Sequence, residues 1–215
     1  MGSWIGGGRN SQWLDSLTCN IIIFSFVVFT ILQKMEDSQW SRASGCPTHY
    51  FSLVVVRHPT TKKYLAVKET RGRGVWLPGG FVENGDNHHK TALKETLEEA
   101  GLDVELLGVL AIQSSIGKRG GRQRVIYYAE PKSPAQQPKS VPDEESEGAF
   151  WVTLDELEAL SNVPPPKGLR GDELLVWARY LEKGGPIYPL GLLQMSENGF
   201  PHFPSEEEKT RLKAN

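Results

Sequence analysis

The chain has 215 residues, of which 39% are hydrophobic and 23% are charged, and its formal net charge is −2. This composition is typical of one globular domain with extensions, and it excludes collagen-like, coiled-coil and multi-pass membrane proteins. The near balance of 24 basic and 26 acidic residues argues against general nucleic-acid binding. Cys19 and Cys46 are too few for a disulfide framework, which indicates a reducing compartment.

The N-terminal segment, residues 1–34, is set apart by an apolar run at residues 21–32. A membrane-spanning helix needs about 20 apolar residues, and this run reaches that length only if residues 17–20 are included. Three interpretations stay open: a signal peptide, a single membrane anchor, or a segment absent from a mature protein that starts at Met35. We expect a cytoplasmic protein, with membrane association only if residues 17–32 are retained.

The next part of the chain, residues 48–190, is expected to form the folded domain, ahead of a charged tail at 191–215. An apolar stretch at 51–56 predicts a buried strand, and 64–67 predicts its hairpin partner across a short polar turn. A short apolar stretch at 75–77 follows, and further strands are predicted at 104–112, 125–129 and 149–152. The Pro-, Ser- and acid-rich stretch at 131–148 indicates a long mobile loop.

Three helices are predicted between or after these strands. Residues 87–100 predict a helix, because Ala92, Leu93, Thr96, Leu97 and Ala100 recur at helical spacing. Gly101 marks the end of this helix. Thr153 and Glu156 form a capping box for a helix through residue 160. Residues 172–183 predict an amphipathic helix whose inward side chains are Leu174, Trp177, Ala178 and Leu181. The mixture of strands and helices indicates an α/β or α+β fold with a mixed sheet.

Three glutamates in the helix at 87–100 suggest chemistry. Glu95 lies one turn from both Glu98 and Glu99, so all three carboxylates share a face opposite Leu93 and Leu97. Such repelling charges are tolerated if a hard cation binds them, and oxygen ligands suit Mg²⁺ or Mn²⁺. The glycine turn before the helix leaves room for a phosphate chain, which suggests pyrophosphate chemistry. For the glutamates alone, a solvated acidic helix face is the alternative.

The whole stretch from Gly80 to Leu102 resembles the box that defines the Nudix hydrolases, G-x5-E-x7-R-E-U-x-E-E-x-G-U, where U is a bulky apolar residue. The matching positions are Gly80, Glu95, Glu98, Glu99, Gly101 and Leu102. Three positions depart, with Asp86 in place of the first Glu, Lys94 in place of Arg and Thr96 in place of an apolar residue. The flanks at 76–80 and 150–157 also resemble the family. The resemblance implies a Nudix-like α/β/α sandwich around a mixed β-sheet.

The resemblance also implies residue roles. Glu95, Glu98 and Glu99 would bind Mg²⁺ or Mn²⁺ and, with Lys94, form the catalytic set, while Asp86 would assist the metal through water. Lys94 lacks the two-pronged geometry of Arg but should still pair with a neighbouring carboxylate. The general base would be Glu98 or a loop carboxylate. Glu147 is the loop candidate, and the alternative for Glu147 is a flexible acid in an acidic loop.

Substrate binding is expected at the glycine turn and at nearby basic residues: Gly79, Gly80, Arg71, Arg73, Arg124 and the loop residue Glu147. Arg124 belongs to a basic glycine loop with Lys118, Arg119 and Arg122, which either holds phosphates or is a solvated hairpin tip. The expected activity is metal-dependent hydrolysis of a diphosphate bond in a nucleoside diphosphate linked to another moiety, or in a related diphosphate. The alternative, supported by Asp86 and Lys94, is a catalytically weak module that binds a nucleotide or a protein partner.

Overall fold

The computed structural model describes residues 45–117 and 120–193. The apolar run at 21–32, the candidate start at Met35 and the tail beyond residue 193 lie outside the described residues. Within the described ranges no helix is long and apolar enough to cross a membrane. The chain from Thr48 onward forms one compact unit, which we describe by itself.

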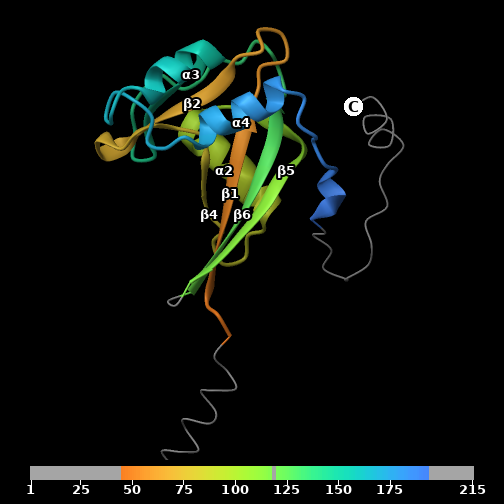
Figure 1. The fold of residues 1–215 in the computed structure, drawn as a ribbon. Helices are drawn as coiled ribbons and strands as arrows, with labels where there is room; N and C mark the ends of the chain where they lie inside the picture. Colours follow the sequence, from red (N-terminus) through yellow and green to blue (C-terminus); the bar gives the residue numbers. More distant parts are fainter. Residues whose placement is uncertain (1–44, 118–119, 194–215) are drawn as a thin grey trace, which may run out of the picture. The chain divides into compact units, whose positions relative to one another are not determined.

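The described residues form seven strands in two sheets (Figure 1). The strands are β1 (Thr48–Val56), β2 (Tyr64–Glu69), β3 (Gly74–Trp76), β4 (Gly79–Phe81), β5 (Val104–Gly117), β6 (Gly120–Pro131) and β7 (Ser146–Val152). One sheet has the order β4-β1-β6-β5 and the other β3-β2-β7. The pairing of β1 with β6 is parallel, whereas the other strand pairs are antiparallel. The predicted mixed sheet is therefore confirmed.

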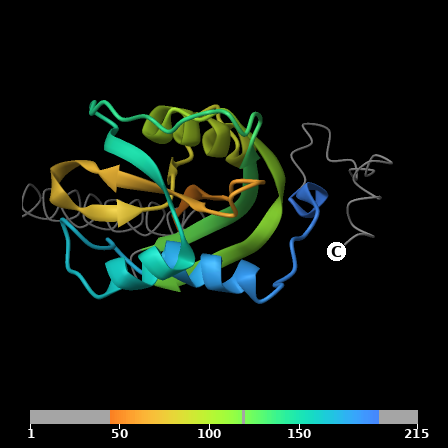
Figure 2. The same cartoon turned by 90° about the horizontal axis from the view of Figure 1, so that it is seen from above.

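Three α-helices lie on opposite sides of these sheets (Figure 2). They are α2 (His88–Ala100), α3 (Leu154–Ser161) and α4 (Glu173–Glu182), and two short 3-10 helices, η1 (Thr70–Gly72) and η2 (Leu190–Leu192), accompany them. Strand β1 is buried on both of its faces, because successive side chains point to opposite sides of a strand. Leu53 and Val55 pack in the core that includes α4, while Val54 and Val56 pack in the core that includes Ala92 of α2. The arrangement is the expected α/β/α sandwich.

The predicted hairpin between residues 51–56 and 64–67 is wrong. Strand β1 pairs with β4 and β6, and β2 pairs with β3 and β7, so the two strands belong to different sheets. They meet only at an isolated bridge between Arg57 and Tyr64. The short turn does bring the ends of the two strands together, but the two hydrogen-bonding edges of β1 are taken by β4 and β6.

The apolar face predicted for α2 is wrong in part. The buried residues are Thr91, Ala92, Thr96 and Ala100, whereas Leu93 is 39% exposed and Leu97 is 55% exposed. Ala92 and Ala100 pack in the core that includes Val54 and Val56 of β1, so the helix is buried through small side chains and not through its leucines. The predicted boundaries are confirmed: Asn87 is the N-cap, and Gly101 ends the helix in a left-handed conformation at φ 67°.

The segment between β6 and β7, predicted to be a mobile loop, is instead fastened to the C-terminal end of α2. The backbone N–H of Lys139 donates to Ala100 O at 2.8 Å, and Ala149 N–H donates to Lys139 O at 2.8 Å. The Lys139 ammonium group donates to Glu98 O at 2.5 Å, and Ser146 Oγ donates to Glu99 O at 2.6 Å. Three of these four bonds satisfy carbonyl groups that the last turn of a helix leaves without partners.

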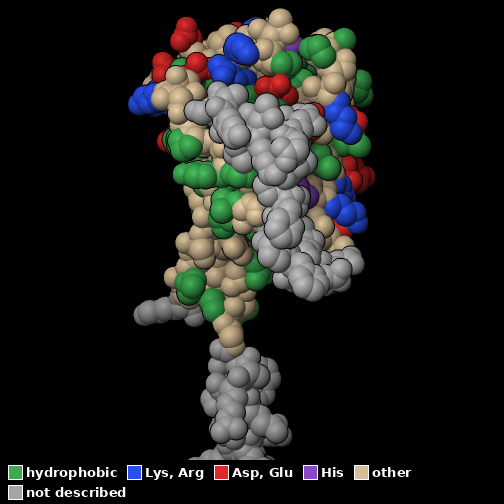
Figure 3. Space-filling model, turned by 90° about the vertical axis from the view of Figure 1, so that its right-hand side faces the viewer, with side chains coloured by type: hydrophobic (Ala, Val, Ile, Leu, Met, Phe, Trp, Pro, Cys, Tyr) green, Lys and Arg blue, Asp and Glu red, His purple; other side chains and the backbone are tan. Residues whose placement is uncertain are grey.

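Charged side chains are unevenly distributed on the face shown in Figure 3, where they gather at the upper end and along one flank. The lower end is formed by the ribbon of β5 and β6 and shows few charges. Ile112 and Ile116 are exposed on this ribbon, with Ile116 exposed by 77%. The ribbon extends beyond the predicted strands at 104–112 and 125–129, because its distal half is held by cross-strand hydrogen bonds and not by core packing.

Candidate active site

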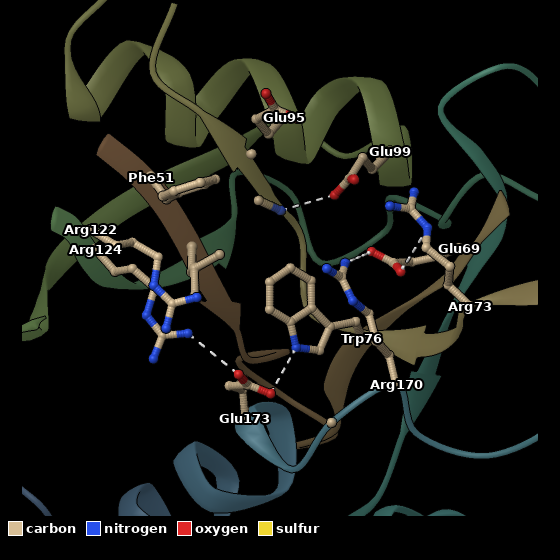
Figure 4. Close-up of a pocket in the computed structure, with 14 residues that line it drawn as sticks. Phe51, Glu69, Arg73, Trp76, Glu95, Glu99, Arg122, Arg124, Arg170 and Glu173 are labelled. Carbon is tan, nitrogen blue, oxygen red and sulfur yellow. Dashed lines mark hydrogen bonds and ion pairs between the residues drawn. The ribbon is translucent and has the colours of Figure 1, made fainter. Parts of the chain in front are cut away.

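A pocket of about 500 Å³ lies between α2, the β1–β4 pair, β6 and the start of α4 (Figure 4). Its wall contains four acidic and four basic side chains: Glu69, Glu95, Glu99, Glu173, Arg73, Arg122, Arg124 and Arg170. Phe51, Leu53 and Trp76 supply apolar surface. A cavity that combines converging charged groups with an apolar wall is typical of a binding site for a small molecule.

Both ends of α2 are held in place, which fixes the carboxylates that this helix carries. The side chain of Asn87 accepts a hydrogen bond from Lys90 N–H at 2.9 Å and caps the first turn. The hydroxyl group of the buried Ser52 on β1 donates to His88 O at 2.9 Å. At the other end, the segment around Lys139 covers the last turn. Glu95 and Glu99 therefore project from a helix that is anchored at both termini.

The two glycines of β4 face these two glutamates. Gly79 N–H donates to Glu99 Oε2 at 2.9 Å. A β-carbon on Gly80 would overlap the carboxylate of Glu95, and one on Gly79 would overlap the carbonyl oxygen of Ser52. Strand β4 can lie between β1 and α2 only because both positions lack a side chain. The glycine turn thus supports the carboxylates directly.

Burial makes both carboxylates hard to ionise. Burial raises the pKa of Glu99 to about 8; the hydrogen bond from Gly79 opposes this rise, and the charges of Glu95, Glu69 and Glu145 add to it. Burial and the charge of Glu98 raise the pKa of Glu95 to about 7. A bound cation would relieve the repulsion between these carboxylates.

The donor set is compatible with Mg²⁺ or Mn²⁺, since it consists of carboxylate oxygens at the edge of a polar pocket. In the described part of the chain, no three acidic, histidine or cysteine side chains converge closely enough to hold a metal by themselves. An ion at Glu95 and Glu99 would therefore need water and substrate oxygens to complete its shell, as Mg²⁺ commonly does.

A second charged cluster forms the side of the pocket near β2. Glu69 is only 4% exposed, and its carboxylate pairs with Arg170 through Oε1 and lies 3.3 Å from Arg73 Nε through Oε2. The guanidinium group of Arg170 lies over the Trp76 ring, 4.3 Å from the ring centre. One buried carboxylate thus orients two guanidinium groups at the same wall.

A third cluster joins β6 to the start of α4. Glu173 accepts from Trp76 Nε1 at 3.1 Å through one oxygen and from Arg124 Nη1 at 3.3 Å through the other. Although burial acts in the opposite direction, hydrogen bonds from its own backbone, Trp76 and Arg124 lower the pKa of Glu173. Gln113 accepts from Arg124 Nη2 at 2.6 Å. Glu173 and Gln113 therefore hold the Arg124 side chain in place at the wall of the pocket.

The structure brings about half of the predicted site residues to this pocket. Those that line it are Glu95, Glu99, Gly79, Gly80, Arg73 and Arg124. Glu98 lies on the exposed side of α2 and acts on Glu95 through its charge. Arg71 lies in η1, does not line this pocket, and has a left-handed backbone conformation at φ 58°. The roles of all these residues stay predictions.

Three other predicted residues pair with neighbours outside the pocket. Lys94 donates to Glu83 Oε2 at 2.8 Å, and this hydrogen bond raises the pKa of Lys94. Lys94 thus pairs with a neighbouring carboxylate, as expected, although with one on the turn before α2. Asp86 pairs with Lys90. Glu147 Oε2 lies 2.7 Å from Lys68 Nζ and does not line the pocket.

Sequence reasoning missed Glu69, Arg170, Glu173 and Glu145. Glu145, two residues before Glu147, acts electrostatically on both Glu95 and Glu99. Glu69 lies two residues beyond the predicted strand at 64–67, and Glu173 lies at the start of the predicted helix at 172–183, near the ends of elements where functional side chains are often found. No spacing in the sequence connects them to the glutamates of α2.

The comparison with family models decides the classification. Residues 48–175 match the model of the NUDIX domain, which covers more than half of the chain. This chain belongs to the Nudix family. The match begins at the first residue of β1 and ends within α4, so it contains all the strands and the acidic and basic residues of the pocket.

Two curated relatives illustrate the range of the Nudix similarity. Nudix hydrolase 4 of Arabidopsis thaliana is 27% identical over 132 residues, which cover 58% of this chain and 61% of the relative. A MutT-like protein of Streptomyces ambofaciens is 22% identical over 178 residues, which cover 82% of this chain and 96% of the relative. The matched part of this chain thus spans less than two thirds of the Arabidopsis protein.

Solved structures agree on the fold. A NUDIX hydrolase from Nitrosomonas europaea superposes with a TM-score of 0.53 at 24% identity, covering 72% of this chain and 99% of that one. A UDP-X diphosphatase superposes with a TM-score of 0.50 at 14% identity, covering 83% and 87%. These similarities confirm the Nudix fold predicted from the box.

Proposed function

We propose that this Nudix protein is a metal-dependent hydrolase of a diphosphate bond in a nucleoside diphosphate linked to another moiety, or in a related diphosphate. The observation that supports this most is the pair of buried carboxylates, Glu95 and Glu99, facing the glycines of β4 inside one pocket. The names of the hydrolase relatives point to the same class of reaction. The cytoplasmic location stays a prediction.

The residues of the pocket divide the work as follows. Glu95 and Glu99 would hold a divalent cation, Mg²⁺ or Mn²⁺, which when bound offsets the charge of the diphosphate and activates water. Arg73 and Arg124 donate to phosphate oxygens from opposite sides of the pocket. Glu69 and Glu173 hold these two guanidinium groups in position. The phosphate groups of the substrate are thereby held in the pocket that contains the carboxylates of α2.

The proton of the attacking water goes to a carboxylate, for which the proposal has two candidates. Glu98 was expected from the family resemblance, and Glu145 is the loop carboxylate whose charge acts on both Glu95 and Glu99. Glu147, the loop candidate from the sequence, pairs with Lys68. Neither loop carboxylate lines the pocket, but Glu147 is paired with Lys68, so we favour Glu145 as the loop residue that takes the proton.

The test is hydrolysis by the full chain, with Mg²⁺ or Mn²⁺ and a panel of nucleotide-linked and inositol diphosphates, with products identified by mass spectrometry. Glu99→Gln should lower turnover by about 100-fold or more, and Glu145→Gln should lower kcat by about 100-fold with little change in KM. Asp155→Asn, an exposed carboxylate of α3, is the matched control and should retain full activity. Hydrolysis that is unaffected by Glu99→Gln would contradict the proposal, and equal losses in Glu145→Gln and Glu147→Gln would remove the preference for Glu145.

A further inference from the structure

Two arginines of β6 lie side by side at one end of the pocket. Arg122 and Arg124 are two positions apart on the strand, so their side chains leave the same face of the sheet. Both line the pocket, and Figure 4 shows their guanidinium groups next to each other, across the pocket from Arg73 and Arg170. The pocket therefore has a pair of guanidinium groups at each end.

The two arginines differ in what holds them. Arg124 is 18% exposed and is bound by Gln113 and Glu173. Arg122 is exposed, and its side chain has no hydrogen bond or ion pair with any residue within 45–117 and 120–193. Since Glu173 compensates Arg124, and Glu69 is shared by Arg73 and Arg170, Arg122 is the pocket guanidinium group without a carboxylate partner among these residues.

Two guanidinium groups side by side repel each other, and an anion between them removes this repulsion. The scissile diphosphate would already be matched by the cation at Glu95 and Glu99. A further negative group on the substrate is what Arg122 can accept, with the fixed Arg124 beside it as a second donor. Phe51, which also lines the pocket and pairs in register with Arg124, supplies an apolar contact next to the pair.

We infer that Arg122 and Arg124 form a subsite for a phosphate group of the substrate other than the diphosphate that is cleaved. The inference rests on the proposed function and narrows the substrate class to diphosphates that carry at least one additional phosphate. That phosphate has two chemical sources, namely a longer phosphate chain or a phosphomonoester on the attached moiety. Arg122 is the specificity-determining residue of this subsite.

The experiment uses the full chain and pairs of compounds that differ by one phosphate. NAD⁺ and NADP⁺ differ by a phosphomonoester on a ribose, and diadenosine diphosphate and diadenosine triphosphate differ in chain length. Affinities are measured by calorimetry in EDTA, which reports on the arginines without a metal, and kcat/KM is measured with Mg²⁺. The variants are Arg122→Gln and Arg122→Lys, with Lys183→Gln after α4 as a control that removes the same charge outside the pocket.

The wild-type chain should prefer the more phosphorylated member of at least one pair by about 10-fold or more, the range of charge-assisted hydrogen bonds. Arg122→Gln should abolish this preference while leaving the less phosphorylated member within about twofold, and Arg122→Lys should restore part of it. The pair that shows the effect identifies the source of the phosphate. Lys183→Gln should match the wild-type chain.

Two results overturn the inference: no preference in either pair, or an equal effect of Arg122→Gln on both members of each pair. A failure of the proposed function is recognised separately. If no compound is hydrolysed with Mg²⁺ but binding in EDTA still shows the preference that depends on Arg122, the subsite stands and the hydrolase proposal falls. If hydrolysis depends on Glu99 but no preference depends on Arg122, the hydrolase proposal stands and the subsite falls.

Discussion

The carboxylate of Glu95 lies where a side chain on Gly80 would have to be, and that of Glu99 accepts a hydrogen bond from Gly79. Four residues from two elements thus depend on one another within a few ångströms. The absence of two β-carbons lets β4 lie against α2, and the carboxylates in return occupy the space that the glycines leave. Any change in this set should act on the position of the carboxylates before it acts on the fold.

Gly80→Ala is the sharpest test of this dependence. The new methyl group overlaps the carboxylate of Glu95, so this side chain must move, and displacing a reacting group by about 1 Å can lower turnover by about 100-fold. We expect kcat to fall by that order, measured with Mg²⁺ on whichever compound the wild-type chain hydrolyses best.

Gly45→Ala is the control, because a β-carbon at Gly45 meets no atom within 4 Å. Circular dichroism and a urea titration show whether Gly80→Ala remains folded. If the folded Gly80→Ala variant keeps wild-type turnover, Glu95 is not a working carboxylate of the site.

The sequence predicts the part of the site that lies close together along the chain. Gly79, Gly80, Glu95 and Glu99 fall within one strand–turn–helix unit, where fixed spacing translates into fixed geometry. Arg170 and Glu145 come from segments whose approach to this unit depends on tertiary packing, and spacing in the sequence carries no information on that approach. Lys94 shows the same limit, because its charge predicts a carboxylate partner but not that the partner is Glu83.

At the scale of the elements, α2 depends on the segment that follows β6. Helix C-termini leave carbonyl groups without hydrogen-bonding partners, and here Lys139 and Ser146 supply donors to the carbonyl groups of Glu98, Glu99 and Ala100. The same segment contains Glu145, whose charge acts on both Glu95 and Glu99. The anchoring of the helix and the placement of the loop carboxylate are therefore one structural arrangement.

Lys139→Met tests this arrangement. Its aliphatic part is kept, but Glu98 O loses its donor, so the free energy of unfolding should fall by about 1–2 kcal/mol. Urea unfolding of both proteins measures this difference. Because α2 loses a hold on its last turn, hydrogen exchange should also increase at the amide groups of residues 97–101.

Lys132→Met is the matched control, since Lys132 pairs with Asp103 on an exposed surface and such pairs contribute about 0–1 kcal/mol. A loss at Lys139 no larger than that at Lys132 would show that the segment does not support α2.

The capping residues in the sequence predicted the ends of the helices correctly, whereas the apolar stretches did not predict which strands pair. Asn87 and Gly101 bound α2, and Thr153 and Glu156 form the capping box of α3, because caps act through hydrogen bonds within a few residues. The pairing of β1 was missed, since two apolar strands joined by a short turn look the same whether or not they share a sheet. The exposed Leu97 shows that burial on a helix follows from what packs against it.

At the scale of the whole molecule, the buried hydrophobic residues of the described chain run from Leu53 to Leu181. The match to the NUDIX domain covers nearly the same range, residues 48–175. Strand β1 connects the two cores, because its alternate side chains belong to different clusters. The fold of the described residues therefore depends on β1.

We expect a shortened chain that starts at Gly45 to fold with a free energy of unfolding within about 0.5 kcal/mol of the full chain. The reason is that the chain from Thr48 onward forms a compact unit of its own. A chain that starts at Arg57 lacks β1 and should not fold cooperatively. Urea unfolding followed by circular dichroism distinguishes the three proteins, and a cooperative transition in the last one would contradict the role given to β1.

The parallel pairing of β1 with β6 also dictates when the site can assemble during synthesis. The paired residues, Thr48 with Gly121 through Val56 with Ala129, are roughly seventy positions apart, and such long-range contacts slow folding. Helix α2 leaves the ribosome before β6 does. Its carboxylates therefore stay exposed to solvent until the sheet that buries them is complete. A nascent chain whose synthesis stops before Ala129 therefore contains the whole stretch of the Nudix box but cannot form the pocket.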